Sequence, residues 1–209
     1  MAGNVSIETI VPCREEETFH ESVRCYLQAL VSIGIGEATL LEWGQELRWP
    51  EPGERVDTAW PYMRLKAQDE SFTTQLRLYR WVEDDESSDK LILSLVFDME
   101  EVIGPGAPFN PTLMYYKRSF GQLAWRIMRE ISKYVSGYGC YLEDEASQGL
   151  LVAMGSEEKK AFWNVSLGIA SREIYEGYLP VPENMVTHRR DEVGIFALRW
   201  HWDVLPWEE

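Results

Sequence analysis

The strongest constraint on the fold is a pair of alternating apolar segments, 72–82 and 91–99, separated by an acidic run. Residues that share a face at every second position predict β-strands. Apart from Arg80, which interrupts the first segment, the shared face holds Phe72, Thr74, Leu76, Leu78, Val82, Leu91, Leu93, Leu95, Phe97 and Met99. We expect a β-hairpin whose strands lie in the core and whose charged tip projects into water.

Two further segments have the period of amphipathic helices. The first begins at Thr18, where Glu21 three residues later fits a capping box, and it ends at Gly34. The second has a broad apolar stripe that runs from Leu113 through Tyr134 to Val135. Each helix should bury one stripe against the rest of the chain.

Short alternating segments indicate additional strands. The opening one precedes Pro12, which favours a place at a sheet edge. The others lie at 138–145, 150–154, 163–169 and 193–202, and the first two of these predict a second hairpin. This order favours an α+β fold, with a largely antiparallel β-sheet packed by two main amphipathic helices. We expect a single domain over 1–209, with a possible subdivision at the Gly/Pro-rich loop 104–111.

The formal net charge of −15 restricts the partners that the chain can bind. Nucleic acid phosphates and anionic membranes would repel it at long range, so we expect neither as a direct partner. Residues 1–104 carry a net −12 and residues 105–209 a net −3. This asymmetry favours a basic protein partner, although an acidic surface can also serve solubility alone.

Composition also indicates the compartment. Three scattered cysteines, Cys13, Cys25 and Cys140, form neither a disulfide framework nor a zinc motif. The first residues do not resemble a secretory signal, and no run of 18 apolar residues occurs. We therefore expect a cytoplasmic protein without a metal or another cofactor.

One pair of residues offers an enzyme-like alternative. His201 and Asp203 would share a face if their strand continues, and could supply two metal ligands or a base with its orienting carboxylate. The alternative function is a small-molecule-binding domain or enzyme that combines this pair with a tryptophan-lined pocket. Trp43, Trp49 and Trp60 could line a ligand groove or pack their loop. Because no catalytic motif is present, we do not expect an enzyme.

The leading hypothesis is based on clusters of acidic residues. Two clusters are predicted hairpin tips, and they form one surface if both lie at the same end of the sheet. With two aromatic residues as possible anchors, the expected partner contacts are Glu83, Asp84, Asp85, Glu86, Asp89, Tyr79, Trp81, Glu143, Asp144 and Glu145. Three more acids, Glu15, Glu16 and Glu17, are explained by the dipole of the first helix.

In size and charge the chain resembles small acidic immunity proteins that neutralise bacterial toxins, and nucleic-acid mimics. The hypothesis is an acidic protein-binding module, most concretely an inhibitor or immunity-type protein that neutralises a basic toxin or nuclease. A structural subunit of a larger assembly is a third possibility. The oligomeric state stays open.

Overall fold

The computed structural model describes residues 3–36, 38–49, 57–81, 89–104, 115–144, 161–184, 186–190 and 193–208. Its strands are β1 (Asn4–Pro12), β2 (Asp57–Ala59), β3 (Met63–Ala67), β4 (Glu70–Trp81), β5 (Lys90–Asp98), β6 (Gly139–Asp144), β7 (Leu167–Ala170), β8 (Val186–Arg190) and β9 (Gly194–Leu198). Its helices are α1 (Glu16–Ser32), α2 (Ala38–Glu46), α3 (Met99–Val102), α4 (Arg118–Tyr134) and α6 (Arg172–Gly177), with 3-10 turns η3 (Ala161–Asn164) and η4 (Arg199–His201).

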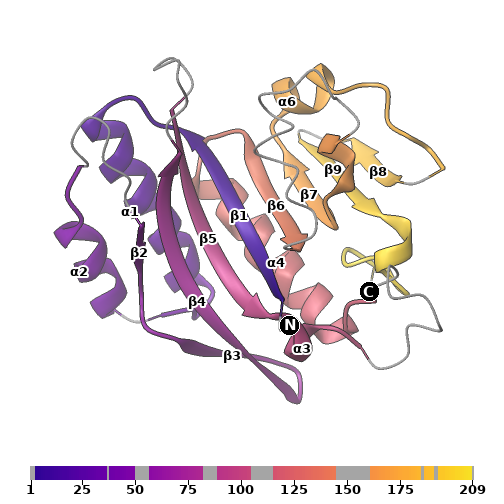
Figure 1. Ribbon diagram of the computed structural model, residues 1–209, viewed down its shortest axis with the longest axis horizontal. Coiled ribbons are helices and arrows are strands. Elements are labelled where there is room, and N and C mark those ends of the chain that lie inside the picture. Colours follow the sequence, from indigo (N-terminus) through magenta and orange to yellow (C-terminus); the bar gives the residue numbers. More distant parts are fainter. Residues whose placement is uncertain are drawn as a thin grey trace.

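The described strands form one nine-stranded sheet in the order β2-β4-β5-β1-β6-β7-β9-β8, with β3 also paired to β4 (Figure 1). Each of these pairings is antiparallel. The opening strand does not lie at a sheet edge, as its proline suggested. It lies between β5 and β6, because Pro12 is its last residue and ends the pairing at Lys90 without interrupting it.

The expected hairpin is present as β4 and β5, except that β5 ends at Asp98 and Met99 begins α3 instead of extending the strand. The two strands pair from Thr74 opposite Phe97 to Trp81 opposite Lys90. The inward-facing leucines and phenylalanines of both strands are buried, as the alternation predicted. Its acidic tip, 82–88, lies outside the described residues.

Helices α1 and α4 pack beside each other over one face of the sheet and bury their apolar stripes there. This confirms the predicted α+β class with an antiparallel sheet and two main helices. The start of α1 differs from the capping-box prediction. Glu15 is the N-cap residue, no side chain caps the first turn, and Thr18 lies inside the helix.

The opposite face of the sheet carries a second core under α6. Trp163 lies 4.9 Å from Phe196 and 5.7 Å from Tyr175 between ring centres. Phe196 crosses Gly168 on the neighbouring strand so closely that a Cβ there would lie 2.3 Å from its ring. This aromatic cluster therefore depends on a glycine that leaves space for it.

Three other expectations differ in detail. Strand β6 pairs with β1 and β7, and the second half of the expected second hairpin, 150–154, lies outside the described residues. Segment 163–169 begins as the η3 turn and becomes a strand only at Leu167, while the last strand ends at Leu198. Within the described ranges, no helix has the length and apolar composition needed to cross a bilayer.

Candidate functional site

A buried ion pair holds the root of the β4–β5 hairpin. Arg80 near the end of β4 contacts Asp89, which directly precedes β5, and the two side chains are only 9% and 6% exposed. The Arg80 guanidinium also lies 4.5 Å from the centre of the Trp49 ring. Separating the two strand ends would leave each charge buried without its partner, which is costly. The pair therefore holds the end of β4 beside the start of β5. Asp89 is therefore an interior residue, whereas the sequence pattern had placed it on the exposed tip.

The chain entering α1 lies beside this root. The Cys13 amide donates to the Asp89 carbonyl at 2.9 Å, and Pro12 lies opposite Lys90 in the sheet. The start of α1 and the root of the hairpin therefore share one end of the sheet, at the top of Figure 1.

Four exposed glutamates of α1 or its N-cap occupy that end. They are Glu15, Glu16, Glu17 and Glu21, and we call this group the acidic end. Glu16 lies 3.7 Å from the imidazole of His20, one turn later. The side chains of Glu15 and Glu17 form no hydrogen bond or ion pair with another described residue. Both carboxylates are exposed to water, although Arg14 directly precedes Glu15 in the chain.

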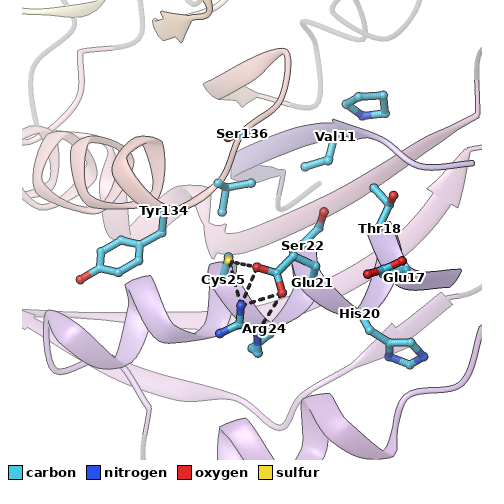
Figure 2. A pocket seen from close by; sticks show the side chains of 12 residues that line it. Val11, Glu17, Thr18, His20, Glu21, Ser22, Arg24, Cys25, Tyr134 and Ser136 are labelled. Carbon is cyan, nitrogen blue, oxygen red and sulfur yellow. Dashed lines mark hydrogen bonds and ion pairs between the residues drawn. The ribbon is translucent and has the colours of Figure 1, made fainter. Parts of the chain in front are cut away.

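A groove of about 640 Å³ opens beside the acidic end (Figure 2). One wall is the first half of α1, and the other is the end of α4 with the chain that follows it. Its lining residues are Val11, Pro12, Glu17, Thr18, His20, Glu21, Ser22, Arg24, Cys25, Tyr134, Val135 and Ser136. The volume is typical of small-ligand and side-chain pockets.

A network of polar groups lines the α1 wall (Figure 2). Arg24 donates from Nη2 to both oxygens of Glu21, at 2.5 and 2.6 Å, and from Nε to Oε2 at 3.0 Å. The Cys25 thiol donates to Glu21 Oε1 at 3.3 Å. These contacts, that of Arg24 first, lower the pKa of the Glu21 carboxyl, so it stays ionised. Burial and the hydrogen bond to Glu21 raise the pKa of Cys25, which argues against a thiolate nucleophile here.

An exposed aromatic ring lies on the α4 wall. Tyr134 is the last residue of α4 and is 43% exposed (Figure 2). Its place in the apolar stripe of the sequence predicted a core residue. The ring stays exposed, whereas the next residue, Val135, packs against the core.

The second acidic cluster lies at the opposite end of the sheet. Asp144, the last residue of β6, pairs with Val5, whereas the hairpin root pairs with Pro12. These two positions are seven residue steps apart along β1, which separates the two ends by about 24 Å. Glu143 is 8% exposed within β6, and Glu145 lies outside the described residues. The two predicted tips therefore do not leave the sheet at one end.

The two aromatic residues expected as anchors belong to β4. The Tyr79 hydroxyl donates to Glu8 Oε1 at 3.1 Å, so this half-buried side chain already has an internal contact. Burial raises the pKa of the Glu8 carboxyl, although the hydrogen bonds from Tyr79 and Ser6 lower it in part. Trp81 ends the strand, and its side chain lies outside the described set, as do Glu83, Asp84, Asp85 and Glu86.

The enzyme-like pair is not brought together on a strand. His201 lies in the η4 turn and is 5% exposed, with Nδ1 at 2.7 Å from the Ser166 hydroxyl, whereas Asp203 is exposed. The Tyr116 hydroxyl lies 3.0 Å from the same Ser166 oxygen. This buried cluster ties the C-terminal turn to the core, and the alternation that would align His201 with Asp203 ends at Leu198.

The other two cysteines, Cys13 and Cys140, are buried. Burial raises the pKa of Cys13 to about 11 and that of Cys140 to about 12. Among the described side chains, no group of three or more histidine, cysteine, aspartate and glutamate residues could hold a metal ion. Of the predicted tryptophan pocket, Trp43 packs on Trp60 at 5.5 Å and Trp49 on Phe19 at 5.6 Å between ring centres.

Sequence reasoning missed the groove, because its walls come from segments about 110 residues apart. One signal was available: Glu17, Glu21 and Arg24 lie at helical spacing and so share one side of α1. No protein-family model, curated protein or solved structure matches this chain.

Proposed function

We propose that the chain is an acidic protein-binding module that docks its acidic end onto a basic protein, in the manner of an inhibitor or immunity-type protein. The main support is that exposed carboxylates and an open groove lie at the same end of the sheet as the root of the β4–β5 hairpin. A basic toxin or nuclease is the partner class that fits this charge.

The physical basis is electrostatic steering. The carboxylates of Glu15 and Glu17 are exposed and form no ion pair with another described residue, so their field reaches into solvent. The net charge of −15 adds to that field, most strongly at low ionic strength. An approaching basic protein would therefore be attracted before any contact forms, and would then bury the groove beside the acids.

The contact surface differs from the one expected from sequence. The proposal keeps Glu83, Asp84, Asp85 and Glu86 and leaves out Asp89, because its side chain pairs with Arg80 in the interior. It also leaves out 143–145, because β6 ends at the other end of the sheet. In their place it takes Glu15, Glu16 and Glu17 of the acidic end.

Affinity capture at low and high salt tests the proposal, with the products of neighbouring reading frames as candidate partners. We expect capture of a basic protein at low salt. For that protein, the combined change Glu15→Gln, Glu16→Gln and Glu17→Gln should lower the association rate constant about tenfold and flatten its salt dependence.

The matched control neutralises three exposed acids elsewhere, Glu173→Gln, Glu183→Gln and Asp203→Asn, which changes the net charge equally. We expect the control to alter the rate far less. Equal effects of the two triple variants, or no effect of either, would contradict docking at the acidic end.

A further inference from the structure

The Glu21 carboxylate binds a guanidinium group, and in this structure that group belongs to Arg24 of the same helix. Three donor–acceptor contacts join the two side chains, and one arginine nitrogen reaches both carboxylate oxygens. The side chains are 54% and 56% exposed. An ion pair this open to water is weak, so an incoming arginine can take the place of Arg24 at little cost.

The groove supplies the remaining parts of such a site. Cys25 donates to Glu21 and helps to fix the orientation of the carboxylate. Glu17, one turn earlier on α1, lines the groove as a second carboxylate that has no partner among the described residues. Tyr134 lies on the opposite wall and has an exposed ring, which in Figure 2 points away from Glu21. A flat cation can stack on such a ring while it pairs with carboxylates.

We propose that the basic partner inserts an arginine side chain into this groove, where it displaces Arg24 from Glu21 and stacks on Tyr134. This inference rests on the proposed function and specifies how the partner is recognised. Arginine suits the groove better than lysine, because its planar fork matches a carboxylate and its flat face suits an aromatic ring.

The test measures binding of fluorescent hexa-arginine and hexa-lysine peptides to the full chain at low ionic strength. If Arg24 competes for Glu21, Arg24→Ala should strengthen hexa-arginine binding about threefold and Glu21→Gln should weaken it by a similar factor. Tyr134→Ala should weaken binding of hexa-arginine more than that of hexa-lysine.

An equivalent exposed pair on α6 provides matched controls. Arg172 contacts Glu176 at 3.0 Å, so Arg172→Ala and Glu176→Gln change the net charge by the same amounts away from the groove. We expect these controls to bind hexa-arginine like the unmodified chain. Circular dichroism of each variant checks that the overall helix content is unchanged.

Two results would overturn the inference. One is an equal gain from Arg24→Ala and Arg172→Ala, which would mean that only net charge matters. The other is loss of binding in Arg24→Ala, which would make Arg24 a contact rather than a competitor. Either result leaves docking at the acidic end intact, because the triple glutamate variant tests that docking with the captured partner.

Discussion

Two carboxylate–arginine pairs lie near the same end of the sheet and differ chiefly in burial. At the hairpin root, Asp89 and Arg80 are 6% and 9% exposed, and Trp49 stacks on the guanidinium. In the groove, Glu21 and Arg24 are 56% and 54% exposed. The first pair cannot be opened without burying a lone charge, whereas water can replace either member of the second. The same chemical groups therefore serve folding in one place and are available for recognition in the other.

Removing the buried carboxylate is the strongest test of this contrast. Asp89→Asn leaves the Arg80 charge buried without a counter-ion, so we expect a loss of about 3 kcal/mol or more in the free energy of unfolding. Urea denaturation measures it. Glu21→Gln is the control and should leave the urea midpoint nearly unchanged. Equal midpoints for the two variants would contradict the structural role of the Asp89–Arg80 pair.

A buried polar contact without a formal ion pair should have an intermediate effect. Ser166 contacts both His201 and Tyr116 in the interior. Ser166→Ala removes the hydroxyl that contacts His201 and Tyr116. We expect the free energy of unfolding to fall by about 1–3 kcal/mol, which urea denaturation measures. A midpoint equal to that of the unmodified chain would show that these hydrogen bonds add nothing to stability.

Glu8 is intermediate in burial between the two carboxylate–arginine pairs. Among the described residues, its carboxylate accepts hydrogen bonds from the hydroxyls of Ser6 and Tyr79. Its pKa is raised by burial above the ordinary 4.5, so the folded chain binds the proton more tightly than the unfolded chain. The stability from this group is complete below that ordinary value and is lost as the pH rises through the raised pKa.

We therefore expect Glu8→Gln to be more stable than the unmodified chain near pH 7, with a difference that shrinks as the pH falls toward 4. Thermal unfolding of both proteins across this range measures it. The glutamine oxygen can still accept from Tyr79 and Ser6, so the variant isolates the charge. A difference that does not vary with pH would contradict the raised pKa.

The smallest expected effect concerns access to the two regions. Cys25 lines the groove and is partly exposed, whereas Cys13 lies buried beside the hairpin root. A thiol reagent should modify Cys25 in the folded protein, slowly because its pKa is raised. Cys13 and Cys140 should react only after unfolding. Mass spectrometry after limited labelling distinguishes these cases, and early labelling of Cys13 would show that the hairpin root opens.

Strand and helix periodicity predicted the fold class and its central hairpin. The alternation from Phe72 to Phe97 was sufficient, because a shift of one residue would turn the shared apolar face of both strands away from the helices that cover it. The position of the first strand was not predictable from its own residues. A proline in that segment indicated an edge, and only its location at the last position lets the strand pair on both sides.

For the candidate site, the sequence predicted a negative charge but not the residues that form it. Sequence predicted an acidic hairpin tip, but it could not tell that the Asp89 side chain would pair with Arg80 in the interior or that β6 would end at the far end of the sheet. It also assigned Tyr134 to the core, because period alone does not reveal which residues at the end of a helical stripe stay exposed. Each of these outcomes depends on a contact between distant segments.

The sequence by itself therefore determined the strand and helix patterns, the α+β class and the acidic imbalance, all of which follow from local periodicity and composition. Tertiary structure alone decided which carboxylates are exposed and which are paired. It brought the first half of α1 beside the end of α4 to form the groove, and it separated the hairpin root from the end of β6 along β1. The physical reason is that burial and electrostatic environment depend on long-range packing, which local sequence patterns do not encode.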